Sequence, residues 1–151
     1  QLYVNGRLAE SYSVDLGSNV LDRKVAAGDQ ATPEGRYRIV RRLDEGESRY
    51  YKALLLDYPN EADRRRLEEH RESGAVSASA RSGGLIEIHG EGGRGTNWTD
   101  GCVALANGDM DELFRRVKVD TPVTIVGGNG RDGIFSNLVL ELARTETASA
   151  P

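Results

Sequence analysis

Two short apolar runs enclose a glycine-rich loop in residues 85–105, which read LIEIHGEGGRGTNWTDGCVAL. The first run has the length and apolar content of a strand, and it ends at His89. The second run begins at Gly101-Cys102. Glycines at positions 90, 92, 93, 95 and 101 give the connection the freedom to fold back on itself. We therefore expect Cys102, the single cysteine of the chain, to lie beside a rigidly held His89.

A histidine next to a cysteine suits nucleophilic catalysis. A free thiol is a weak nucleophile at its pKa of about 8.5, and a neighbouring charged imidazole lowers that pKa. Gly101 has no side chain, so its amide and that of Cys102 are candidates for an oxyanion hole, where each donor is worth roughly 3 kcal/mol in other enzymes. From these residues alone, a buried structural cysteine and a histidine that merely ends a strand remain an alternative.

The remaining apolar patterns predict mostly strands. Residues 1–16 predict a hairpin that turns at Asn5-Gly6, followed by a strand on which Tyr12, Val14 and Leu16 share a buried face. After a turn at residues 32–35, Tyr37 and Ile39 should lie on one face of a strand, with arginines on the other. Further strands are expected at 50–56, 85–88 and 121–126, with a turn at 127–130. Residues 134–142 fit either a helix or a strand.

Two helices are expected at the periphery. Asn60 should cap a polar, surface-exposed helix over residues 61–72, with Glu61 and Arg65 paired across one turn. Asp109 should cap a second helix in a capping box with Glu112. Its core face is formed by Met110, Leu113, Phe114 and Val117. The sequence thus predicts a β-rich α+β fold, in a single domain over residues 1–144, followed by a disordered tail over residues 145–151.

Composition narrows the classes of function. The chain has 151 residues and a net charge of -4, whereas nucleic-acid binders usually carry a basic surface. No apolar stretch approaches the roughly 18 residues of a membrane span. One cysteine excludes an intramolecular disulfide, and two histidines with one cysteine are too few for a structural zinc site. We therefore expect neither a metal nor a nucleic-acid partner.

At the residues quoted above, the chain resembles the L,D-transpeptidase catalytic domain family (YkuD-type), which remodels bacterial peptidoglycan. The resemblance rests on His89-Gly90 and on Asn97-Trp98-Thr99-Asp100-Gly101-Cys102, a Trp-Thr-x-Gly-Cys motif typical of one branch. It extends to residues 2–6, to residues 32–37 and to residues 56–60, and covers roughly residues 1–126. It implies a β-sandwich-like YkuD-type fold with peripheral helices.

The resemblance also implies a role for each matched residue. Cys102 would be the nucleophile and His89 its base, with the carbonyl of Gly90 orienting the imidazole, and the amides of Gly101 and Cys102 would form the oxyanion hole. Trp98, Thr99, Asp100 and Arg94 are the candidates for binding substrate. No cofactor is implied. The partners would be peptidoglycan stem peptides, with an amine acceptor or a wall-linked protein, in an extracytoplasmic location (periplasm or cell wall).

Two positions depart from the family pattern. Asp100 replaces the usual second histidine, and Ala104 stands where many members carry an arginine that can meet a substrate carboxylate. We expect the side chain of Asp100 to turn away from Cys102 and to bond backbone amides or an arginine. An L,D-specific hydrolase that releases a peptide or a wall-linked protein is an alternative function. A non-catalytic cell-wall-binding module is an alternative of another class.

Overall fold

The structure is a computed structural model that describes residues 1–127 and 137–142, the second range by its backbone alone. The strands are β1 (Leu2–Val4), β2 (Arg7–Glu10), β3 (Gly35–Leu43), β4 (Ala53–Leu56), β5 (Glu87–His89), β6 (Val103–Ala104), β7 (Pro122–Val126) and β8 (Asn137–Leu142), and the helices are α1 (Glu61–Glu72) and α2 (Asn107–Arg116). The turn predicted at 127–130 lies, after residue 127, outside the described residues. The predicted tail at 145–151 and the domain end at 144 also lie outside them.

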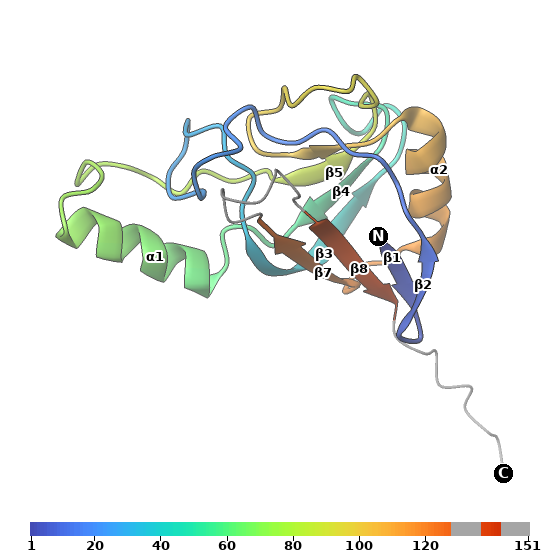
Figure 1. Cartoon of the computed structure of the whole chain (residues 1–151), viewed down its shortest axis with the longest axis horizontal. Helices are drawn as coiled ribbons and strands as arrows, with labels where there is room; N and C mark the ends of the chain where they lie inside the picture. Colours follow the sequence, from blue (N-terminus) through green and yellow to red (C-terminus); the bar gives the residue numbers. More distant parts are fainter. Residues whose placement is uncertain (128–136, 143–151) are drawn as a thin grey trace, which may run out of the picture.

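Within the described residues the strands form one curled mixed sheet in the order β2-β1-β8-β7-β3-β4-β5-β6 (Figure 1). Neighbouring strands are antiparallel, except that β1 runs parallel to β8 and β5 parallel to β6. The long strand β3 joins the two halves, because Gly35–Arg38 pair with β7 and Ile39–Leu43 pair with β4. The predicted β-rich α+β class, with helices outside the sheet, is confirmed.

The predicted first hairpin and the predicted face of β3 are confirmed. Asn5 and Gly6 turn between β1 and β2 with φ of 52° and 73°, the left-handed conformation that this turn requires. Tyr37 and Ile39 are 3% and 0% exposed, whereas the arginines that alternate with them face solvent. The ambiguous segment contributes strand β8 from residue 137. Alternation along a half-buried strand therefore predicted this region well.

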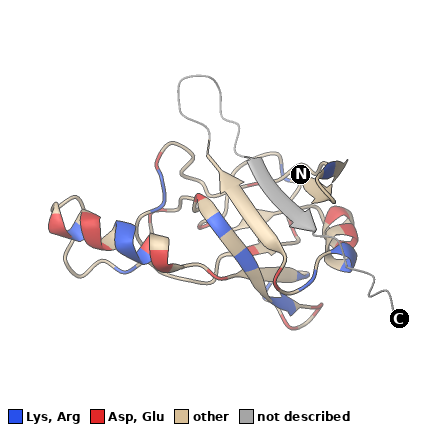
Figure 2. Cartoon of the chain, turned by 90° about the horizontal axis from the view of Figure 1, so that it is seen from below, with Lys and Arg blue, Asp and Glu red and all other residues tan. Residues whose placement is uncertain are grey.

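Helix α1 also matches its prediction. It spans residues 61–72, Asn60 and Asp63 form a capping box, and Arg65 donates to Glu61 at 3.1 Å. Among the residues of α1 only Asp63 and Leu67 are buried, so the helix lies on the surface, where basic and acidic side chains alternate along it (Figure 2). None of the described helices is long and apolar enough to cross a membrane.

The predicted N-terminus of α2 is wrong, but its predicted core face is correct. The helix begins at Asn107 after Ala106, without a side-chain cap, so Asp109 lies in the first turn instead of ahead of it. The Asn107 side chain does not cap the helix, because it accepts from the amide of Glu91 at 2.7 Å. The four predicted core residues, 110, 113, 114 and 117, are all buried.

Three predicted strands are shorter than expected. Residues 12–16 form no regular strand, and only the isolated bridge of Asp15 with Ala104 pairs within them. Strand β4 starts at Ala53, because residues 50–52 bend away from the ladder. Strand β5 starts at Glu87, because Leu85 adopts a left-handed φ of 55°. Two of the residues left out contact the candidate site, because Tyr50 stacks on His89 and the Leu85 carbonyl faces the thiol of Cys102.

We expect the buried face of β3 to contribute more to stability than its exposed face. Ile39→Ala removes a side chain with no exposed surface and should lower the free energy of unfolding by about 2–5 kcal/mol. Its neighbour Val40 is 46% exposed on the opposite face, so Val40→Ala should change it by roughly 0.5 kcal/mol. Urea unfolding of the two variants measures the difference. Equal losses would show that β3 does not present these faces as described.

Candidate active site

The parallel pairing of β5 with β6 places the thiol and the imidazole on the same side of the sheet. Ile88 lies opposite Val103 and His89 opposite Ala104. Continuing this register back by one residue sets Cys102 beside Glu87, and side chains two apart on a strand share a face. The amide of Glu87 lies 3.5 Å from Cys102 Sγ, in agreement with that register. Glu87, His89 and Cys102 therefore project from one face, while Ile88 fills the core on the other.

The imidazole of His89 is held in one tautomer. Its Nδ1 lies 2.6 Å from the carbonyl oxygen of Gly90, which can only accept, so Nδ1 carries the hydrogen and donates it. In the neutral ring Nε2 then has a lone pair. This atom is buried and has no hydrogen-bond partner within the described part of the chain. An unpartnered buried acceptor costs stability, which is typical of a functional site.

Aromatic rings enclose His89 on two sides. The Tyr50 ring stacks on the imidazole with 3.8 Å between centroids and 10° between planes, and Trp98 meets it edge to face at 6.0 Å. Burial lowers the pKa of His89 below its ordinary value of 6.5, and the bond to Gly90 only partly opposes this. The imidazole is thus mainly neutral at neutral pH and available as a base.

Cys102 differs from the sequence-based expectation in its electrostatics. Burial raises the pKa of the thiol above its ordinary value of 9.0, and the carboxylates of Glu87 and Asp100 raise it further. The Glu87 amide and the Lys24 ammonium oppose the shift without reversing it. The expected lowering by a charged imidazole is wrong for the resting protein, because burial keeps His89 neutral. The thiol hydrogen instead faces the carbonyl oxygen of Leu85, 3.6 Å from Sγ.

The turn before Cys102 requires glycine at 101. Gly101 has φ of 129°, and a Cβ added there would lie 2.7 Å from the carbonyl oxygen of Ala31. The Thr99 hydroxyl closes the turn, since it donates to the Cys102 carbonyl at 2.8 Å and accepts from the Gly101 amide at 3.2 Å. Thr99 thus shapes the turn, and one of the two predicted oxyanion donors already has a long internal bond.

A buried carboxylate anchors the glycine-rich loop. Asp15 is 4% exposed and accepts from the backbone amides of Arg94 and Gly95 and from Nε1 of Trp98, at 2.9, 3.2 and 3.2 Å. The guanidinium of Arg94 lies over the Trp98 ring at 3.6 Å from its centroid. Trp98 and Arg94, both predicted from the sequence, therefore form one wall next to His89.

A second anchored loop holds a buried cation near Cys102. Lys24 is 4% exposed and donates to Asp29 at 2.7 Å, and Asp29 also accepts from the amides of Val25, Ala26 and Ala31. Burial would raise the pKa of Asp29, but these bonds hold it below its ordinary value. The carbonyl of Ala31 touches Gly101, so this loop sets both the position of the turn and the nearest positive charge.

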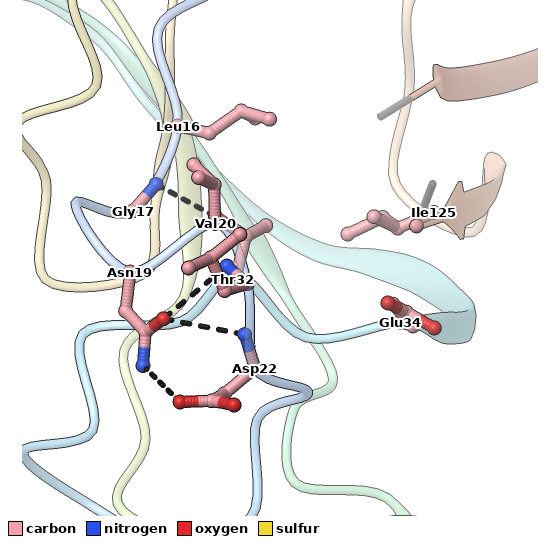
Figure 3. A pocket seen from close by; sticks show the side chains of 10 residues that line it. Leu16, Gly17, Asn19, Val20, Asp22, Thr32, Glu34 and Ile125 are labelled. Carbon is pink, nitrogen blue, oxygen red and sulfur yellow. Dashed lines mark hydrogen bonds between the residues drawn. The ribbon is translucent and has the colours of Figure 1, made fainter. Parts of the chain in front are cut away.

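A cavity of about 40 Å³ lies beside that loop (Figure 3), enough for a few waters. Gly17 donates there to Thr32 at 2.9 Å, and the Asn19 carboxamide bonds Asp22 at 3.2 Å. The cavity is lined by neither Cys102 nor His89. Its bonds fix the loop that carries Lys24, so it is structural support for the candidate site.

The structure brings most of the predicted residues together, with one exception. His89 and Gly90 lie at the end of β5, Trp98 meets His89 edge to face and Arg94 lies on Trp98. Cys102 follows Gly101 and lies beside Glu87, and within the described residues its thiol makes no hydrogen bond to His89. Asp100 is exposed and forms no hydrogen bond or ion pair within residues 1–127, so the bonds expected for it are absent. Its charge acts on the thiol instead.

Four residues at the site were missed by the sequence analysis: Glu87, Tyr50, Asp15 and Lys24. Strand alternation could have found Glu87, because it stands two residues before His89. The other three come from loops, whose course no pattern predicts. Among the described residues no group of three or more histidine, cysteine, aspartate or glutamate side chains could hold a metal ion.

Comparisons with known proteins agree with the resemblance seen in the sequence. The family model for the L,D-transpeptidase catalytic domain (YkuD) matches residues 1–125. Two curated relatives, from Escherichia coli K12 and O157:H7, are each 32% identical over 111 residues, and both are named, provisionally, L,D-transpeptidase YafK. The match covers 74% of this chain but only 38% of each relative.

The charge of Lys24 should contribute to the reactivity of Cys102. Because the pKa of the thiol is raised, its alkylation by iodoacetamide should keep accelerating from neutral pH to beyond 9.0. Lys24→Met removes a cation that lowers the pKa of the thiol, so alkylation at neutral pH should slow about two- to threefold. Lys52→Met is the matched control, because it breaks an equally short pair, with Asp111 at 2.7 Å, beside α2. Equal rates in both variants would exclude an electrostatic role for Lys24.

Gly101 should tolerate no side chain. In Gly101→Ala the added methyl would push against the Ala31 carbonyl, and the φ of 129° would be strained, so unfolding free energy should fall by about 1–3 kcal/mol. Alkylation of Cys102 should change as well, because the turn must move. Gly95→Ala has positive φ in open space and should cost only about 1 kcal/mol. Thermal melting and alkylation rates of both variants test this, and indistinguishable variants would contradict it.

Proposed function

The chain belongs to the L,D-transpeptidase catalytic domain family, and on this basis we propose that it is a cysteine acyl-transfer enzyme of peptidoglycan. Cys102 would attack the amide between an L- and a D-centre of a stem peptide and form a thioester. An enzyme acting on this substrate would work in the periplasm or the cell wall. The relatives' name supports the transpeptidase reading, although the match covers little of their length.

One observation carries the proposal: the buried lone pair of His89 Nε2, which has no partner in the described chain and lies on the same face of the sheet as Cys102. A structural histidine would satisfy both ring nitrogens. Here the Gly90 carbonyl fixes the tautomer and leaves Nε2 free to accept a proton. A backbone oxygen thereby takes the place of the third member of a catalytic triad.

The reaction would start from a neutral pair. The thiol turns from the Leu85 carbonyl, and Sγ attacks the amide carbon while its proton passes to Nε2 of His89. The oxyanion of the tetrahedral intermediate would accept a hydrogen bond from the amide of Cys102. The amide of Gly101 would become a second donor once it releases the Thr99 hydroxyl. The C–N bond then breaks, and the imidazolium gives its proton to the leaving amine. This leaves an acyl thioester on Cys102 and a neutral imidazole.

The second step decides the product. An incoming amine loses a proton to Nε2 as it attacks the thioester, the thiol recovers that proton, and a cross-link results. Water in place of the amine gives hydrolysis. The wall formed by Trp98 and Arg94 would receive the stem peptide, with Arg94 exposed to meet a carboxylate. Asp100, at the rim of the turn, is the remaining candidate contact.

The nucleophile can be tested by mass spectrometry. We expect the wild-type protein incubated with purified muropeptides to acquire one acyl adduct on Cys102 and to release a shortened product. Cys102→Ala should give neither, and Cys102→Ser should be nearly inactive, because a hydroxyl is much harder to deprotonate. His89→Gln should slow adduct formation by about two orders of magnitude or more.

Products formed with and without an added amine separate transfer from hydrolysis. Undiminished turnover in Cys102→Ala would overturn the proposal. Muropeptide binding without any adduct in the wild-type protein would instead support a wall-binding module.

A further inference from the structure

Glu87 is a carboxylate at the nucleophile that the proposed chemistry does not use. It is half-buried on the face shared with His89 and Cys102, and its own amide contacts Sγ. Its carboxylate has no hydrogen bond and no ion pair within the described residues. Burial also raises the pKa of this carboxyl group, as expected where water is partly removed and no partner replaces it.

The buried carboxylates Asp15 and Asp63 and the half-buried Asp29 have partners. Asp15 accepts three N–H groups, Asp29 pairs with Lys24 and three amides, and Asp63 pairs with Arg66 at 2.9 Å and with Tyr37 at 3.0 Å. These bonds replace the water that each carboxylate loses on folding. Glu87 differs from them because it has no such partner. It also lies beside the sulfur of Cys102, so its charge acts directly on the thiol.

In the resting protein this carboxylate opposes catalysis. Its negative charge disfavours the thiolate of Cys102, in the same direction as burial. A positive group that bound to Glu87 would cancel this charge and would place a cation next to the sulfur. Binding of that group would therefore favour the thiolate only when substrate is present.

We propose that Glu87 is the binding site for a primary ammonium group of the substrates, held against Cys102 by a charge-assisted hydrogen bond. This inference rests on the proposed function and deepens it, because it names a recognition element of the same site. Glu87 faces the site and is only half-buried, so a small cation can reach it. Two sources share this chemistry: a free side-chain amine on the donor peptide, or the acceptor amine.

The experiment uses two isosteric variants that each remove one negative charge near the thiol, Glu87→Gln and Asp100→Asn. Without substrate, both should be alkylated faster than the wild-type protein at neutral pH, because both carboxylates raise the pKa of the thiol. This common effect shows that both variants are folded at the site. Glu87→Asp keeps the charge and serves as the conservative variant.

The first readout is protection of Cys102 from iodoacetamide by stem peptides with either a free or an N-acetylated side-chain amine. It needs no turnover. If the donor supplies the ammonium, wild-type protein and Asp100→Asn should bind the free-amine peptide about tenfold more tightly than the acetylated one. Glu87→Gln should show no preference, and Glu87→Asp should restore part of it.

The second readout is the dependence of product formation on the added acceptor amine. If the acceptor supplies the ammonium, its KM should rise about tenfold in Glu87→Gln and much less in Asp100→Asn. The rate of donor acylation should shift in the same direction in both variants, because each loses a charge that raises the pKa of the thiol. Where no product forms, protection of Cys102 by the acceptor amine alone replaces this readout. It too should be lost in Glu87→Gln.

The inference is overturned if Glu87→Gln keeps the wild-type behaviour in both readouts, or if Asp100→Asn changes as much as Glu87→Gln does. The second result would mean that local charge alone matters, or that Asp100 is the receptor. Failure of the proposed function is a separate result, since it appears as a missing adduct on wild-type Cys102 while protection by peptides is still measured.

Discussion

The parallel pairing of β5 with β6 is the constraint on which the candidate site depends. Parallel neighbours put equivalent residues side by side, so one register brings Glu87, His89 and Cys102 to one face. A parallel pair also needs a long connection, and the glycine-rich loop of residues 90–101 supplies it. Asp15 anchors that loop by accepting hydrogen bonds from its backbone amides, although it is distant from the loop in sequence.

Burial sets the electrostatics of the nucleophile more strongly than its partners do. It shifts both members of the pair toward neutrality, lowering the pKa of the imidazole and raising that of the thiol. At neutral pH the proton of the thiol is thus still on sulfur. The positive charge of Lys24 lowers the pKa of the thiol, whereas the negative charges of Glu87 and Asp100 raise it. If the proposed function holds, a thiol kept protonated in this way would be protected from adventitious reactions until substrate binds.

Local patterns predicted the elements, and long-range packing decided the details. The alternation in β3, the cap of α1 and the core face of α2 could all be predicted, because each depends on residues a few positions apart. His89 and Cys102 could be named from their motif. The stacking of Tyr50, the anchoring by Asp15 and the sign of the thiol shift could not, since they depend on loops that meet only in the folded chain. The start of β4 was mispredicted because Tyr50 leaves the ladder and stacks on His89, and the start of β5 because Leu85 adopts a left-handed φ.

The two departures from the family pattern have different physical consequences. Ala104 is 0% exposed, and its backbone exchanges two bonds with Asp15 at 2.8 and 2.9 Å, so an arginine side chain would have no room at this position. The cation nearest the opening is instead Arg94, held on Trp98 by a ring contact and by its Nε bond to the Glu91 carbonyl. Its terminal nitrogens have no partner in the described chain and can bind a carboxylate. The positive charge is thus supplied by the loop that Asp15 anchors, because the strand itself is too tightly packed to carry it.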